Sequence, residues 1–265
     1  MIYEQIAANK RNSILLCALF VVFVAFLGWI FGQVSSMGNG GIALAVVIAL
    51  FWTFGSYYWS DRIVLAMSGA RPLRKEEFPH LFHSVEGLSI AAGLPVPRVY
   101  VIEDSAPNAF ATGRDPGHAV ICVTTGLLHQ LDRLELEGVV AHELSHIGNY
   151  DILLGSLVVV MVGIVTLLSD WIMRSYFWGG RRRRDDERGG QGAAILLVAG
   201  MLLALVAPLI AQLVRLAISR RREFLADASG ALITRYPKGL ADALRKLDAD
   251  TDPLEAANKA TAHMY

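Results

Sequence analysis

The stretch His142-Glu143-Leu144-Ser145-His146 decides how this chain is organised. Its two histidines are four residues apart, so on a helix they lie on one face, one turn from each other. Both imidazoles can then reach a single metal ion. Glu143 projects about 100° around the helix from His142, where it can take a proton from a water that the metal activates. This spacing is typical of zinc peptidases, with the histidines as ligands and the glutamate as general base.

A catalytic zinc keeps three protein ligands and one open position, so a third ligand must come from elsewhere. The best match follows in Arg220-Arg221-Arg222-Glu223-Phe224-Leu225-Ala226-Asp227, where two acidic residues four apart share a helix face. We expect Glu223 to bind the metal and Asp227 to accept the second ring N–H of His142. The alternative is a solvated acidic pair among arginines, which the histidine motif makes less favoured.

The segment before the motif is polar and predicts a small sheet with helices. A helix over residues 78–92 should end at Gly93. Asp132, with Glu135 as its capping-box partner, should begin the helix that carries the motif. Three strands are predicted between these helices, at residues 98–102, 108–113 and 118–123. A small sheet ahead of the metal helix is the layout expected of a zincin.

The rest of the chain is strongly apolar. Hydrophobic residues make up 54% of the sequence and the mean hydropathy is +0.44, above an ordinary soluble domain. Four apolar runs could each cross a hydrocarbon core of about 30 Å, and they lie at residues 14–32, 41–59, 152–169 and 193–214. Tyr57, Tyr58 and Trp59 sit where an interfacial aromatic belt is expected.

These runs predict a mainly helical α+β membrane protein with two transmembrane hairpins and a zincin-like catalytic domain. The expected segments are an N-terminal hairpin at 1–60, the catalytic sheet and motif helix at 61–151, a second hairpin at 152–214 with an arginine-rich loop at 173–192, and the third-ligand helix at 215–265. Most of the 24 Lys and Arg residues fall inside if both termini face the cytoplasm, although the arginine loop breaks that rule. The alternative is a second hairpin that is re-entrant or covered by protein.

Spacing along the chain also predicts where the metal lies. If the motif helix runs unbroken into the apolar run at 152–169, and the run at 193–214 continues into the Glu223 helix, two helices leaving the membrane assemble the site. The metal would then lie roughly 10–15 Å from the membrane surface, outside the hydrocarbon. Four charges in residues 131–137 argue against the alternative of an intramembrane site.

The charge, cysteine and histidine content of the sequence predicts no further binding partner or disulfide framework. The formal net charge is zero, so nothing predicts a nucleic-acid partner. Cys17 and Cys122 do not make a disulfide framework. The histidines outside the motif are interpreted as surface or packing residues, namely His80, His83, His118, His129 and His263.

Three stretches together resemble the HtpX-type membrane zinc proteases, bacterial and archaeal relatives of the CAAX prenyl protease. They are the motif at 142–146, the R-x-E-F-x-A-D pattern at 221–227, and Asn108-Ala109-Phe110-Ala111-Thr112-Gly113. The resemblance covers nearly the whole chain. Family members continue beyond Tyr265 with a segment that closes the cleft, so the resemblance implies a C-terminal truncation.

The resemblance implies an endopeptidase on the cytoplasmic side of the cell (inner) membrane, acting on misfolded or membrane-tethered proteins in quality control and stress response. It places one zinc ion per chain on His142, His146 and Glu223, with Glu143 as general base. It also places substrate along an edge strand containing Asn108, Ala109 and Phe110. Two alternatives stay open: a prenyl-protein protease, and an inactive membrane scaffold with a structural metal, against which the intact Glu143 argues.

Overall fold

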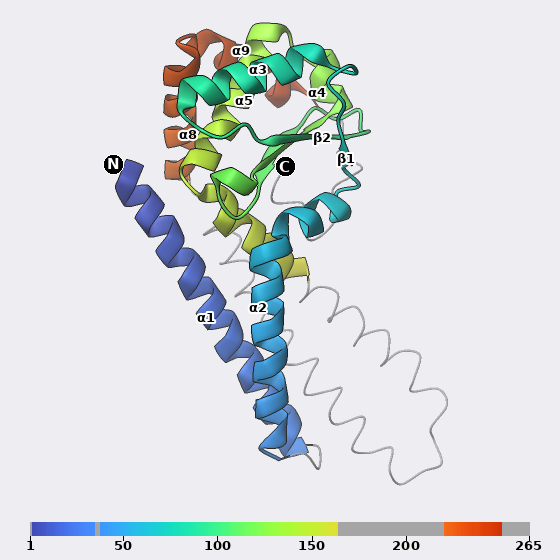
Figure 1. Ribbon diagram of the computed structural model, residues 1–265, viewed down its shortest axis with the longest axis vertical. Coiled ribbons are helices and arrows are strands. Elements are labelled where there is room, and N and C mark those ends of the chain that lie inside the picture. The colour runs from blue at the N-terminus through green and yellow to red at the C-terminus, as the bar shows by residue number, and fades with distance from the viewer. Residues whose placement is uncertain (1, 35–37, 164–219, 251–265) are drawn as a thin grey trace.

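The computed structural model describes residues 2–34, 38–163 and 220–250 (Figure 1). Two long helices project from one side of a domain built from a small sheet and several shorter helices. The predicted span at 193–214, the arginine loop, His263 and the link from that span into the Glu223 helix lie outside the described residues.

The two projecting helices are α1 (Ile2–Val34) and α2 (Gly40–Met67), and both are long and apolar enough to cross a membrane. Glycines let their backbones approach closely. A Cβ on Gly28 would lie 2.2 Å from the Cβ of Ala45, and one on Gly41 would lie 2.6 Å from the carbonyl oxygen of Gly28. Small residues at such a crossing are the usual way for membrane helices to pack.

The sheet has four strands in the order β1-β2-β4-β3. They are β1 (Arg71–Pro72), β2 (Arg98–Ile102), β3 (Ala109–Thr112) and β4 (Val120–Thr124). β2 and β4 are parallel, whereas β3 runs antiparallel to β4 and forms one edge. The last three strands lie where the sequence predicts them. The two-residue β1 was not predicted, because it is too short to carry a pattern.

Most helices of the domain pack around the helix that carries the motif, and that helix contacts the sheet at β3. The helices are α3 (Pro79–Ala92), α4 (Thr125–Gln130), α5 (Arg133–Gly148), α8 (Arg220–Thr234) and α9 (Pro237–Ala249), with a 3-10 turn at Pro116–His118. The capping box of Asp132 and Glu135 is present at the start of α5, and Gly93 ends α3 with a φ of 67°. Both ends are therefore where the sequence predicts them. Leu81, Ile121 and Leu144 are among the fully buried side chains of the core between α3, the sheet and α5.

The expectation that the motif helix runs unbroken into the apolar segment is wrong. α5 ends at Gly148, and the following helix, Asp151–Gly163, is bent from it by 84°. Tyr150 lies between them in the left-handed region with a φ of 61°, a conformation that costs about 1–2 kcal/mol for a residue with a Cβ. The Lys10 ammonium of α1 lies 4.1 Å from the centre of the Tyr150 ring, a cation–π contact at the bend.

After the bend, the Asp151–Gly163 helix is almost wholly buried between α1 and the sheet. Leu157 and Met161 pack against Leu16 of α1. On the other side the Ser156 hydroxyl lies 2.7 Å from the Thr112 hydroxyl, and it accepts a hydrogen bond from the backbone N–H of Gly113. The end of edge strand β3 is thereby fixed to the helix that follows the motif.

Candidate metal centre

The three predicted ligands meet at one point, although they come from two helices far apart in sequence. The Nε2 atoms of His142 and His146, both on α5, lie 3.1 Å apart. A carboxylate oxygen of Glu223, on α8, lies 3.5 Å from each of them. Tetrahedral ligands at about 2.0–2.2 Å from zinc would lie about 3.4 Å from one another. The donor set and its spacing therefore fit a zinc ion.

Each imidazole is oriented by a carboxylate on its other nitrogen. The Nδ1–H of His142 donates to Asp227 at 2.9 Å, and the Nδ1–H of His146 donates to Asp151 at 3.0 Å. Such bonds fix the tautomer and leave both Nε2 atoms unprotonated for a metal. The contact of Asp227 with His142 has the geometry that the sequence predicts for it.

Close packing between α5 and α8 brings Glu223 and Asp227 to the motif. A Cβ on Gly230 of α8 would lie 3.1 Å from the backbone nitrogen of His142, so a larger residue would push the two helices apart. Ala226, one turn before Gly230, is fully buried. Small residues at these positions allow α8 to lie directly against the motif.

Sequence reasoning missed Asp151. It follows His146 by five residues, and on a straight helix that spacing turns its side chain about 140° away from the imidazole. The bend after Gly148 returns it to His146. Asp151 is then held by two further groups: the Asn9 amide of α1 donates to it at 2.7 Å, and the Arg222 guanidinium lies 3.5 Å away.

Asn9 also secures the bend itself. Its buried amide donates a second hydrogen bond, at 2.9 Å, to the backbone carbonyl of Asn149. A side chain of the first membrane helix thus contacts both the turn and the carboxylate that orients a predicted metal ligand. No local sequence pattern predicts the hydrogen bond between Asn9 and Asp151, because the two residues are separated by 142 positions in the sequence.

The electrostatics of the site suit a cation. Burial lowers the pKa of His146, but hydrogen bonds to Asp151 and Glu223 outweigh it and raise that pKa to about 10. Burial is likewise overcome at His142, where Glu223 and the charge of Glu143 raise the pKa. Hydrogen bonds from both imidazoles lower the pKa of Glu223. The carboxylates therefore stabilise positive charge between them, which a divalent metal would supply in place of the imidazole protons.

Glu143 and the strand residues lie around this centre. Glu143 is 8% exposed, and its charge acts on both imidazoles. Ala109 and Phe110 lie on edge strand β3, with Asn108 just before it. The Phe110 side chain is buried with Val64 in a cluster beneath the sheet, so only its backbone could face a peptide along the edge.

A protein family and several curated proteins match this chain along most of its length. The model of peptidase family M48 matches residues 75–262. The protease HtpX homolog of Dictyoglomus thermophilum is 45% identical over 99% of this chain and 85% of its own length. That of Thermoanaerobacter pseudethanolicus is 45% identical over 100% of this chain and 88% of its own length. The crystal structure of S. mikatae Ste24p aligns with a TM-score of 0.49 at 18% identity, covering 98% of this chain and 63% of Ste24p.

Proposed function

This chain belongs to peptidase family M48 and is a membrane metallopeptidase, and we propose that it is a zinc-dependent endopeptidase with its active site at the cytoplasmic face of the cell (inner) membrane. The observation that carries the proposal is the meeting of two imidazoles and one carboxylate within 4.8 Å of one another, beside the buried Glu143. His142, His146 and Glu223 would hold one zinc ion per chain.

Each residue of the proposed site has a separate role in peptide hydrolysis. When bound, zinc supplies a Lewis acid that polarises the scissile carbonyl and makes water more acidic. Glu143 accepts a proton from the attacking water and passes it to the leaving amine. Asp227 and Asp151 hold the two imidazoles in the tautomer that binds metal, which keeps the site geometry fixed during turnover.

Substrate would lie extended along β3. An edge strand offers backbone hydrogen bonds that do not depend on the sequence of the peptide, and β3 is an edge of the sheet next to α5. We assign Asn108, Ala109 and Phe110 to this role through their backbone. A cleft of this kind accepts many unfolded segments, which supports misfolded or membrane-tethered proteins as substrates and a role in quality control and stress response.

The membrane arrangement is part of the proposal. α1 and α2 would form one transmembrane hairpin, and the runs at 152–169 and 193–214 a second, giving four spans with both termini in the cytoplasm. The balance of basic residues supports this orientation. A prenyl-protein protease is the alternative within the same chemistry, and only substrate tests separate the two.

Replacing Glu143 by glutamine tests the proposal directly. The amide is nearly the same size but cannot take the proton, so casein cleavage in detergent should fall by about 10²–10⁴-fold. Zinc content should stay at one per chain. The control is Glu137→Gln on the same helix, where Glu137 pairs with Arg133 at the surface and activity should be retained. Cleavage by Glu143→Gln near the wild-type rate would exclude Glu143 as the general base, whereas a wild type that holds zinc without cleaving would favour a scaffold with a structural metal.

A further inference from the structure

A second polar site lies away from the metal centre, where the domain meets the membrane helices. It is a pocket of about 400 Å³ between the end of α2 and the connection that joins β3 to β4. The membrane helix contributes one wall, with Phe54, Tyr58 and Arg62 on one face at successive helical turns. The domain contributes the other wall, with Arg98, Arg114 and His118.

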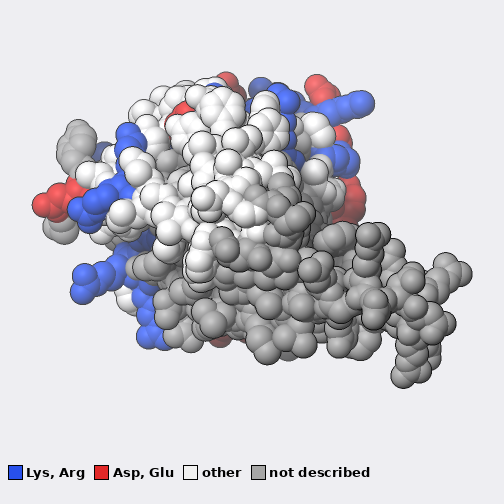
Figure 2. Space-filling model, turned by 90° about the horizontal axis from the view of Figure 1, so that it is seen from below, with Lys and Arg blue, Asp and Glu red and all other residues white. Residues whose placement is uncertain are grey.

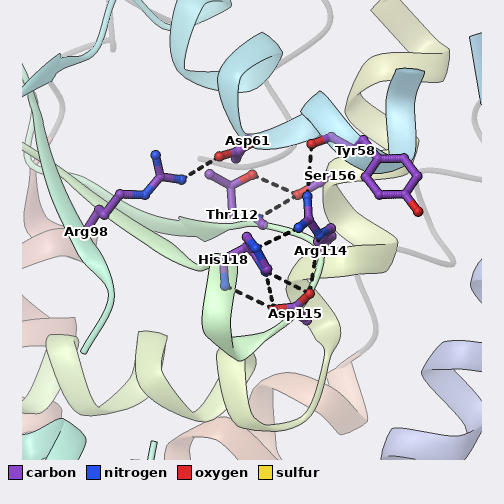
Figure 3. Close-up of polar contacts among 9 residues, drawn as sticks. Tyr58, Asp61, Arg98, Thr112, Arg114, Asp115, His118 and Ser156 are labelled. Atoms are coloured by element: carbon purple, nitrogen blue, oxygen red, sulfur yellow. Dashed lines mark hydrogen bonds and ion pairs between the residues drawn. The ribbon is translucent and has the colours of Figure 1, made fainter. Parts of the chain in front are cut away.

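The cations of this pocket are held in place by the protein. Figure 3 shows Arg114 between the β3–β4 connection and α2. Its guanidinium donates to the backbone carbonyl of Tyr58 at 3.3 Å and lies over the Tyr58 ring at 5.2 Å. A second N–H donates to Nε2 of His118 at 2.6 Å, and the Nδ1–H of His118 donates to Asp115 at 2.7 Å. This chain of contacts fixes the direction of Arg114.

Positive charge exceeds negative charge in the lining. Three arginines, Arg62, Arg98 and Arg114, stand against Asp61 in the lining and against Asp115, which lies 3.4 Å from Arg114, so one positive charge is in excess. Asp61 pairs with Arg98 at 2.5 Å and is the less exposed partner, with 13% of its side chain accessible against 49%. Arg62 is exposed, and among the residues that the structure describes it has no ion-pair partner. Its guanidinium is therefore available to an anion.

The depth of the pocket matches the headgroup region of a bilayer. Tyr57, Tyr58 and Trp59 are all partly exposed on α2, as residues of an interfacial belt are. Arg62 follows Trp59 by three residues, a rise of about 4.5 Å, which is within the headgroup layer next to the hydrocarbon. Seen from below, along the projecting helices, Lys and Arg side chains lie at the margins of this face of the molecule (Figure 2).

We propose that this pocket binds the phosphate of an anionic phospholipid. The phosphate would lie against Arg62 and Arg114, and an acyl chain would follow the exposed side of Phe54 and Tyr58 into the membrane. Arginine is well suited to phosphate, and basic residues at a membrane surface attract anionic lipid. The arginines disfavour the choline cation of the zwitterionic phosphatidylcholine headgroup, which gives that lipid no net negative charge. A water-soluble phosphate would leave the aromatic wall uncovered.

Native mass spectrometry of the full chain in detergent tests this proposal. The probes are dioleoyl phosphatidylglycerol, dioleoyl phosphatidylcholine and inorganic phosphate. One phosphatidylglycerol should be retained per chain, about tenfold more tightly than phosphatidylcholine. Arg62→Gln should weaken that binding about fivefold. Arg62 makes no ion pair with any residue in the described ranges, so the fold of that part of the chain should be unaffected. Arg245→Gln is the matched control, since Arg245 is an exposed cation on α9 outside the pocket.

Three results would overturn the proposal. Equal retention of the two lipids would remove the headgroup preference. Equal weakening by Arg62→Gln and Arg245→Gln would show a general charge effect without a site. Displacement of the lipid by millimolar inorganic phosphate would make the pocket a site for soluble phosphate instead. The assay requires neither metal nor cleavage, so failure of this proposal would leave the proposed peptidase activity standing.

Discussion

The two imidazoles of the metal centre are supported in different ways. Asp227, which orients His142, has 38% of its side chain exposed and comes from α8, the helix that also carries Glu223. Asp151, which orients His146, has only 10% exposed and lies at a sharp bend held by α1. One proposed ligand is thus oriented from α8, and the other from a bend that α1 holds in place. The difference implies that the metal site depends on the position of α1.

Among the substitutions that distinguish the support of His146 from that of His142, Asp151→Ala should weaken zinc binding most. Asp151→Ala removes the acceptor for His146 and leaves the Asn9 amide and the nearby Arg222 without their carboxylate. Loss of such a support costs about 10–100-fold in metal affinity, and we expect the upper end here because the site is buried. Competition with a zinc chelator measures the loss. Asp151→Asn, which keeps an oxygen acceptor, should recover part of it.

Asp227→Ala should weaken zinc binding less, by about tenfold, the lower end of the same range. Water can reach this position and can partly replace the carboxylate at Nδ1 of His142, because Asp227 is more than a third exposed. The same chelator titration applies. A loss equal to or greater than that of Asp151→Ala would contradict the asymmetry between the two supports.

Asn9→Ala should have a smaller effect, about threefold to tenfold, since Asn9 acts on the metal only through Asp151. If Asn9 had a structural role alone, its replacement would lower thermal stability without changing the geometry or the affinity of the metal site. The readout is therefore the visible spectrum of the Co²⁺-substituted protein, which reports ligand geometry, together with zinc affinity. Asn12→Ala is the control, because Asn12 is an exposed asparagine on the same helix. Identical spectra and affinities for the two variants would exclude a link from α1 to the site.

The supports of His142 and His146 also differ in how far the sequence could predict them. The features that depend on local spacing were predictable: the capping box of α5, the end of α3 at Gly93, and the placement of His142 and His146 on one face. Glu223 and Asp227 could be predicted to face the histidines because their own spacing repeats that of the histidines, and the structure brings all four side chains together. In each case a helical period of 3.6 residues supplies the information.

The missed features depend on a break in that period or on distant contacts. The 84° bend places Asp151 where a straight helix would not. Gly148 and Asn149 followed by Asp151 are a helix-stop and N-cap pattern that the sequence reasoning did not use, and that pattern predicts a break without its angle. The contact of Asn9 with Asp151 exists only because α1 extends past the membrane run to reach the bend. Propensity and patterning describe single elements, so a contact between elements needs the fold.

The most direct test of the account is zinc K-edge X-ray absorption on the wild type and on Glu223→Ala, combined with zinc content. The wild type should hold one zinc per chain, with two imidazole nitrogens and a carboxylate oxygen at about 2.0–2.2 Å. In Glu223→Ala the carboxylate oxygen should disappear, and zinc should fall well below one per chain. An unchanged spectrum with full zinc content in Glu223→Ala would contradict the claim that α5 and α8 together hold the metal.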